Sequence, residues 1–254
     1  MLRLIVPLTG LIYLLLAIFA VSDSLAERNW EFSIAGFGGK AFHSNQDIQV
    51  SQVNLAGGGT GFDTTVHGVQ LNDSGTFGAK LTAWYLPRQY NWQPQIGLQL
   101  DFTRYTADLN PQTQGAGGAT NIPGFQVGSI TFGSTRDVSV DTLAANLLFR
   151  YPIWPTDNLP QGRIAPYVGI GVGIQRAALT AEINGHKEID YSPAGQLLAG
   201  MNFFLMRNVA IFGEYKRIWS THDFTYSADI APPGYEEKWH MATNIVAGGV
   251  ALHF

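Results

Sequence analysis

Ser220, His222 and Asp223 are the residues whose types come closest to a hydrolytic site. Acyl transfer uses a serine nucleophile, a histidine base and a carboxylate that orients the base. These three residues are so close in the chain that they cannot form a triad by themselves, and a partner from another segment would be needed. We therefore expect no enzymatic activity and assign no catalytic residue.

Metal and cofactor sites find no support in the sequence. The six histidines, for which solvated surface positions are expected, have no metal-binding spacing, and there are no cysteines to supply thiolates or disulfides. The glycines of Gly169-Ile170-Gly171-Val172-Gly173 resemble a phosphate-binding loop, but they lie inside a strand-like segment and no helix follows. Small residues there are expected to make room for large neighbours. The histidines are His43, His67, His186, His222, His240 and His253.

Six charged residues, three of each sign, fall on the polar faces of strand-like segments. If these faces line the inside of a closed structure, the charges are buried and must be paired. The sequence predicts an ion-pair network that fills the lumen, and a selective channel lined by the same residues is the alternative. The six are Glu31, Lys80, Asp101, Arg150, Glu214 and Lys216.

The elements that carry these charges are predicted to be eight strands with a period of two, which a helix cannot imitate. In the clearest, Ile96, Leu98, Leu100 and Phe102 alternate with polar or small residues. The predicted strands are Trp30–Gly39, Phe77–Leu86, Gln95–Tyr105, Asp141–Tyr151, Ala165–Gln175, Ala194–Leu205, Val209–Trp219 and Trp239–Phe254.

The last strand places Val246, Val250, Leu252 and Phe254 on one face and ends the sequence on an aromatic residue. Its length suits the roughly 9–11 tilted residues with which a strand crosses a bilayer. Nothing after the first residues contains an apolar run near 18 residues, so a closed β-barrel is the expected form of a membrane-embedded protein.

Composition agrees with this form. Charged residues make up 13 % of the chain, aromatic residues 12 %, and there are 29 glycines; soluble proteins have about 25 % charged residues. The formal net charge of −4 and the absence of a basic stripe argue against a nucleic-acid partner.

The first residues are typical of a secretory signal. Arg3 precedes an apolar stretch from Leu4 to Val21, and Ser24-Leu25-Ala26 supplies small residues for cleavage. We predict a signal peptide over residues 1–26, cleavage between Ala26 and Glu27, and one barrel domain over residues 27–254. A permanent membrane anchor is the alternative.

The predicted connections alternate between short and long. Three are short to moderate, and the others are longer or more polar, notably the Gly-rich segments 40–76 and 106–140. Outer-membrane barrels have short periplasmic turns and long external loops, which places both termini at the periplasmic rim. Aromatic residues are predicted near both rims: Trp30, Trp84, Tyr85, Tyr90, Trp92, Tyr151, Trp154 and Phe254 at the inner one, and Phe77, Tyr105, Trp219 and Trp239 at the outer one.

The chain resembles the eight-stranded outer-membrane β-barrel proteins of Gram-negative bacteria, which include the membrane domain of outer membrane protein A and small porin-like surface antigens. The resemblance covers the predicted mature chain and is carried by residues 165–173, 196–200, 211–216 and 248–254. It implies an outer-membrane location, outer-membrane lipid and the assembly machinery as partners, and an assembly signal at Phe254. Some small members acylate or deacylate lipid A, and in such an enzyme Ser220, His222 and Asp223 would be the hydrolytic residues to consider.

The predicted fold is an all-β, transmembrane, eight-stranded antiparallel up-and-down β-barrel, present as a monomer without cofactors. The expected role is structural or interactive, with the lumen filled by side chains. A narrow porin-like pore and a lipid A-modifying enzyme are the alternatives in function. A soluble lipocalin-like barrel, with its apolar face inward, is the alternative in fold.

Overall fold

The computed structural model describes residues 29–53, 61–88, 90, 92–120, 128–133, 135–156, 159–181, 187–225 and 235–254. The predicted signal peptide and its cleavage position, Ala26 and Glu27, lie outside these residues. Every strand pairing is antiparallel. The strands are β1 Trp30–His43, β2 Gln46–Val53, β3 Gly61–Val69, β4 Ser74–Tyr85, β5 Gln95–Thr106, β6 Gln112–Thr120, β7 Ser129–Phe132, β8 Arg136–Arg150, β9 Ile164–Ala181, β10 Lys187–Met206, β11 Val209–Thr225 and β12 Tyr235–His253.

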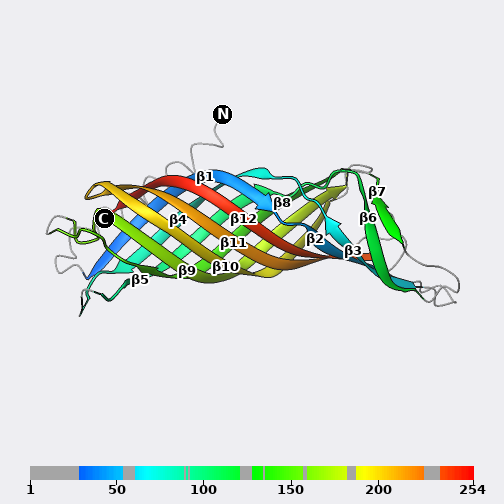
Figure 1. Ribbon diagram of the computed structural model, residues 1–254, viewed down its shortest axis with the longest axis horizontal. Helices are drawn as coiled ribbons and strands as arrows, with labels where there is room; N and C mark the ends of the chain where they lie inside the picture. The colour runs from blue at the N-terminus through cyan, green and yellow to red at the C-terminus, as the bar shows by residue number, and fades with distance from the viewer. Residues whose placement is uncertain are drawn as a thin grey trace, which may run out of the picture.

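Eight of these strands form a closed ring. They pair in the order β1-β4-β5-β8-β9-β10-β11-β12, and β12 returns to β1. The closing ladder runs from Ser33 opposite His253 to His43 opposite Thr243. In Figure 1 these strands make one cylinder whose strands are tilted to its axis, with the C-terminus at the same end as the turns that join β4 to β5, β8 to β9 and β10 to β11. We call this the inner end and the opposite end the outer end.

The wall of the cylinder has the polarity that the sequence predicts. Along β5 the side chains alternate strictly between buried and exposed. Leu98 and Leu100 face outward, 59 % and 54 % exposed, whereas Gln99 and Asp101 are buried inside. Water disfavours such an apolar outer belt, and hydrocarbon accepts it. The soluble lipocalin-like alternative is wrong, and the predicted transmembrane eight-stranded barrel is confirmed. The described part of the chain contains no helix with the length and hydropathy for a membrane span.

The sequence predicts two long loops over residues 40–76 and 106–140, but the structure has strands in both segments. Residues 40–76 contain β2 and β3, and residues 106–140 contain β6 and β7. The outer end of β12 pairs with β2, and the sheet continues through β3 and β6 to β7. Figure 1 shows these strands extending the barrel beyond the ring. Alternation of Ile48 and Val50 with Asp47, Gln49 and Ser51 is the signal that could have found β2.

The strands also run farther outward than predicted, because the polarity of the wall inverts along them. In β8 the inward residues near the inner end are polar, such as Asn146 and Arg150, but farther out they are Val138 and Val140. The reason is that the outer part of the barrel stands in water and needs an apolar interior. The sequence pattern predicts a strand only as far as its apolar residues face outward. Farther out the apolar residues face inward, so the predicted strand ends too early.

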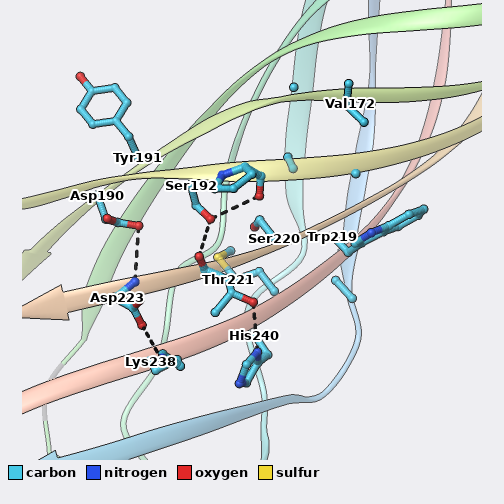
Figure 2. Close-up of a pocket in the computed structure, with 16 residues that line it drawn as sticks. Val172, Asp190, Tyr191, Ser192, Trp219, Ser220, Thr221, Asp223, Lys238 and His240 are labelled. Carbon is cyan, nitrogen blue, oxygen red and sulfur yellow. Dashed lines mark hydrogen bonds and ion pairs between the residues drawn. The ribbon is translucent and has the colours of Figure 1, made fainter.

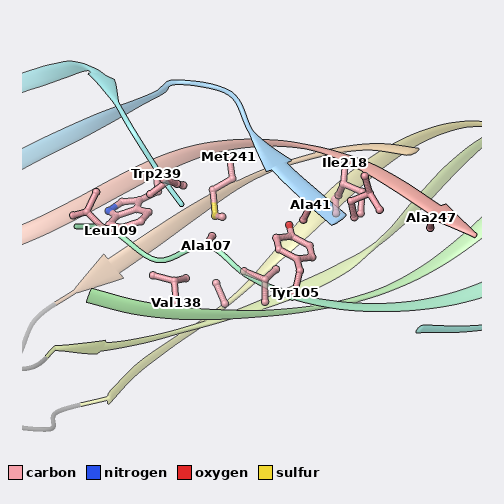
Figure 3. Packing of buried hydrophobic residues seen from close by; sticks show 14 of the residues in the cluster. Ala41, Tyr105, Ala107, Leu109, Val138, Ile218, Trp239, Met241 and Ala247 are labelled. Carbon is pink, nitrogen blue, oxygen red and sulfur yellow. The ribbon is translucent and has the colours of Figure 1, made fainter. Parts of the chain in front are cut away.

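An apolar core fills this outer part (Figure 3). Leu109 closes it, since it bridges to Leu71 on one side and to Arg136 at the start of β8 on the other. Three of the rings predicted for the rims are buried within the barrel instead: Trp239 and Tyr105 in this part, and Trp84 nearer the inner end. The buried members of the apolar core in the outer part include Ile48, Val66, Leu109, Val138, Leu179, Phe224 and Trp239.

The β8–β9 turn folds across the inner mouth. Gln161 donates from its side-chain amide to the carbonyl of Arg207 at 3.0 Å, and Phe204 donates its backbone N–H to the carbonyl of Arg163, also at 3.0 Å. Gly162 has a φ of 77° and lies so close to the backbone of Ile153 that a Cβ would clash. The turn thus narrows the mouth of the lumen from the inner end.

Candidate functional site

The lumen between the outer core and the inner mouth holds all six charged residues that the sequence singles out. Each is at least 94 % buried, the most exposed being Glu31 at 6 %. They come from five strands, β1, β4, β5, β8 and β11. Because the strands alternate, each residue enters the lumen from its own part of the wall, and the side chains meet near its axis in three oppositely charged pairs.

The pair nearest the inner end joins β8 to β1. Arg150 donates from Nη1 to Oε1 of Glu31 at 2.8 Å and from Nη2 to Oε2 at 3.3 Å. Its Nε donates to the side chain of Gln95 at 2.9 Å, and its guanidinium lies 4.3 Å from the centre of the Trp84 ring. His253 reaches the same carboxylate through Nδ1 at 2.8 Å. The Arg150 guanidinium is therefore held by a bidentate ion pair with Glu31, by the Gln95 amide and by the face of the Trp84 ring.

The other two pairs lie next to each other deeper in the lumen. Lys80 Nζ lies 2.5 Å from Oε2 of Glu214, which also accepts a hydrogen bond from the hydroxyl of Tyr167 at 2.8 Å. Lys216 Nζ lies 2.6 Å from Oδ2 of Asp101 and 3.8 Å from Oε1 of Glu214. The four charges thus form one network in which each lysine faces a carboxylate.

Aromatic rings and amides fill the space around the charges. Lys80 lies over the rings of Phe37 and Phe212, at 5.0 and 4.7 Å from their centres. Amide side chains bridge the strands, as where Asn146 donates to Gln99 at 3.0 Å and Gln196 donates to Asn146 at 3.1 Å. The sequence interpretation missed these residues, although amides on the inward face of an apolar strand are a signal that could have found them.

The glycines of β9 fit against this filling. A Cβ on Gly171 would clash with the Asn146 side chain and the backbone of Ala145, and one on Gly169 would clash with Leu148. The prediction that small residues here make room for large neighbours is confirmed. These glycines thereby let the inward side chains of Asn146 and Leu148 on β8 pack against β9.

Little free space is left beside the pairs. One cavity of about 20 Å³ is bordered by Lys80, Tyr167 and His253, which is room for a single water molecule. At the inner mouth a shallow space of about 190 Å³ is lined by Glu31, Gln161 and His253 among others. It ends at the Arg150–Glu31 pair.

A second polar cluster lies at the outer end of the lumen. Gln175 of β9 is fully buried; its amide nitrogen donates to the hydroxyls of Thr142 at 2.8 Å and Tyr105 at 3.2 Å. Its carbonyl oxygen accepts from Ser220 at 2.5 Å and lies 3.0 Å from Nε2 of His222. The cluster joins β5, β8, β9 and β11 at the level where the lumen turns apolar.

This cluster corrects the proposed hydrolytic set. Ser220 and His222 are buried inside, but Asp223 faces outward and pairs with Lys238 at 3.4 Å. The carboxylate that faces His222 is Asp190 of β10, whose Oδ2 lies 2.8 Å from Nδ1. Since Ser220 and Nε2 of His222 both bond to Gln175, the serine and the histidine base are not joined as acyl transfer requires.

The histidines do not all lie on the surface as expected. His222 and His253 are buried within the barrel, whereas His67 and His240 are exposed. His43 lies at the end of β1 with Nε2 3.0 Å from the carbonyl of Thr106, and His186 lies outside the described residues. Within the described ranges no group of three or more histidine or acidic side chains is arranged to hold a metal ion.

No protein-family model matches the sequence, and no curated protein matches it significantly. Among solved structures, Neisserial surface protein A is 14 % identical, with 88 % of this chain and 97 % of that chain covered and a TM-score of 0.45. The outer membrane protein OprG from Pseudomonas aeruginosa is 13 % identical, with 87 % and 95 % covered and a TM-score of 0.43. The outer membrane protease OmpT from Escherichia coli is 10 % identical, with 88 % and 97 % covered and a TM-score of 0.41.

These identities and TM-scores are too low to assign a function to this chain. The ring of eight strands, the apolar belt and the charges inside define the class of this protein from its own geometry. It has the fold of the eight-stranded outer-membrane β-barrel proteins.

Proposed function

We propose that this protein is an outer-membrane β-barrel whose lumen is closed by side chains and whose role is structural and interactive at the cell surface. The closed ring with an exposed apolar belt supports the location, because hydrocarbon tolerates strands only where every backbone group is paired. The single observation that carries the closed lumen is the set of three buried ion pairs across it.

Three buried ion pairs, with nitrogen–oxygen distances of 2.5–2.8 Å, lie across the lumen in the path of a passing solute. An eight-stranded barrel is just wide enough for its own side chains. The apolar core of the outer part lies in series with the ion pairs, so a solute would meet two different barriers. Both features favour the closed barrel over the porin-like pore.

The surface role is supported by the outer sheet. Strands β2, β3, β6 and β7 stand beyond the ring on a packed core. Segments held rigidly at the outer end are suited to contact other molecules, and composition alone does not name the ligand. The protein acts as a monomer, with outer-membrane lipid around its belt.

Assembly in the membrane is proposed to depend on Phe254, the aromatic residue that directly follows β12. Its backbone N–H donates to the carbonyl of Phe32 at 2.8 Å, so the residue is fixed beside β1 at the inner rim. Replacing Phe254 with Ser should lower the amount of folded protein in the outer membrane. Removal of residues 1–26 during export, with Glu27 as the new first residue, is checked by sequencing the mature N-terminus.

Conductance of the folded protein in a planar lipid bilayer tests the closed lumen. A heat-dependent shift on a gel first verifies that the sample is folded, and a boiled sample gives the background. We expect no steady current steps of uniform size. Uniform steps would contradict the proposal and support the porin-like pore, and a mass change of lipid A on overexpression would support the lipid-modifying enzyme.

A further inference from the structure

Strands β10 and β11 separate at their outer ends. Their shared ladder ends with Ala194 opposite Ser220. Farther out, β10 continues along β9 as far as Lys187, and β11 continues along β12 as far as Thr225. Pro193 stands at the point of separation, and a proline has no amide hydrogen to give to a ladder. The wall therefore forks between β10 and β11, which are paired from this point toward the inner end.

The fork forms a groove of about 820 Å³ on the outer face of the wall (Figure 2). The part of the groove nearer the inner end is lined by apolar and small residues, namely Val172, Gly195, Trp219 and Ala242. The part nearer the outer end is lined by residues with polar groups, namely Tyr191, Thr221, Lys238 and His240. Ligand pockets occupy about 300–1,000 Å³, so the groove has the size of a binding site.

Side chains close the back of the groove in place of the missing ladder. Ser192 donates from its hydroxyl to the carbonyl of Thr221. Oδ2 of Asp190 lies 2.8 Å from Nδ1 of His222. The same oxygen accepts from the backbone N–H of Asp223 at 3.4 Å (Figure 2). His222 is fully buried behind these contacts.

The groove lies at the outer edge of the apolar belt. On its inner side the next outward residues in the ladders are Leu197 on β10, Arg217 on β11 and Asn244 on β12. Farther toward the inner end the wall is apolar, with Tyr215 46 % and Val246 53 % exposed. At the edge of the groove nearer the outer end, Lys238 and Asp223 form an exposed ion pair. The groove thus spans the level where the apolar wall gives way to charged residues, which corresponds to the boundary between hydrocarbon and headgroups of the outer leaflet.

We propose that this groove binds one lipid of the outer leaflet, an inference that rests on the membrane placement proposed above. The acyl chain lies in the part of the groove nearer the inner end, against Trp219, whose indole packs on Gly195. The phosphate-bearing headgroup lies beside Lys238 and His240. The contact between Lys238 and Asp223 is a weak competitor, since exposed pairs contribute only about 0–1 kcal/mol.

Photo-crosslinking of the full chain in native outer membranes tests the site. Trp219 is replaced by p-benzoylphenylalanine, and Phe102 is the matched control, because these belt residues are 41 % and 39 % exposed. Samples are irradiated in the membrane and again after detergent extraction and washing. In the membrane both positions should give adducts of lipid mass. After extraction, position 219 should retain several-fold more lipid adduct than position 102.

A second pair of variants shows whether the groove holds the lipid. Ala242→Phe fills the groove and should lower the retained adduct at position 219 several-fold. Ala145→Phe enlarges an outward alanine of β8 away from the groove and should leave the adduct unchanged. Variants are compared in their folded, heat-shifted form.

Equal adducts at the two positions after extraction, or an adduct that Ala242→Phe does not lower, would overturn the lipid site. An adduct of peptide mass at position 219 would also overturn it and would indicate a protein partner. If neither position gives a lipid adduct in intact membranes, the membrane placement itself is wrong, which separates failure of the proposed function from failure of this site.

Discussion

The Nζ of Lys216 lies 2.6 Å from Oδ2 of Asp101, and this contact crosses the whole lumen. Asp101 is on β5 and Lys216 on β11, and three strands separate them in either direction round the ring. Lys216 also donates to the hydroxyl of Thr103 at 2.9 Å. The contact therefore ties opposite walls of the barrel and stands at the centre of its interior.

Replacing Lys216 with Met should destabilise the barrel strongly, because it leaves Asp101 charged and buried without its partner. Breaking one partner of a buried pair costs about 3–5 kcal/mol. The double variant Asp101→Asn with Lys216→Met should cost less than the single variant, since no charge is then stranded. Urea unfolding of the refolded protein in lipid vesicles measures both. A single variant as stable as the wild type would contradict the ion-paired lumen.

Replacing Gly171 with Ala should cost about 1–3 kcal/mol, the range for overpacking. A Cβ at Gly171 meets Asn146 and the backbone of Ala145. Gly213→Ala is the matched control, since Gly213 also lies within a strand of the ring and its Cβ would meet nothing within 4 Å. The same unfolding assay compares them, and equal stabilities for the two variants would show that β9 is not packed as described.

The carboxyl group of Asp73, outside the membrane between β3 and β4, should titrate at a lower pH than its ordinary pKa of 3.8. A hydrogen bond from Lys40, 3.1 Å away, is the main cause of the lowered pKa. A lowered carboxyl pKa means that the contribution of the pair is present above pH 3.8 and is lost as the pH falls through the lower pKa. NMR titration of the carboxyl carbon measures this, and Lys40→Gln should bring the pKa back toward 3.8. An unchanged titration in that variant would exclude the pair.

Replacing Glu237 with Gln should loosen the outer sheet without unfolding the ring. Glu237 is fully buried, forms an ion pair with Arg136 at 2.5 Å and accepts from the indole of Trp239 at 3.1 Å. Loss of its charge removes the carboxylate from a 2.5 Å ion pair with an arginine side chain that is only 18 % exposed. Limited proteolysis should become faster within β2, β3, β6 and β7, while the heat-dependent gel shift remains. Asp223→Asn, in an exposed pair, is the control expected to change neither.

The strands within the membrane could be predicted because one physical rule governs all of them. Outward residues such as Leu98 and Val250 meet hydrocarbon, inward residues such as Asp101 and Lys216 must pair, and a period of two separates these sets. The six lumenal charges follow from this phasing. The phasing does not predict which carboxylate each cation pairs with, since partners such as Arg150 and Glu31 are 119 residues apart in the sequence.

The outer half could not be derived in the same way. There the inward residues are apolar, as with Leu179 and Trp239, and the outward ones face water. Because the apolar face changes from outward to inward along one strand, the sequence pattern of that strand is typical of a shorter strand followed by a loop. The Asp190–His222 contact was missed for a related reason, because Asp190 lies in a segment that was interpreted as a connection.

Spin labelling along β5 tests the orientation and closure of the barrel together. The chain has no cysteines, so single cysteines at positions 98, 99 and 100 give unambiguous labels. With the protein in lipid vesicles, labels at positions 98 and 100 should be relaxed strongly by oxygen, which dissolves in hydrocarbon. The label at 99 should be shielded both from oxygen and from a water-soluble nickel chelate. Strong relaxation at 99 by the chelate would contradict the closed lumen, and strong relaxation at 98 and 100 by the chelate would contradict the outward apolar belt.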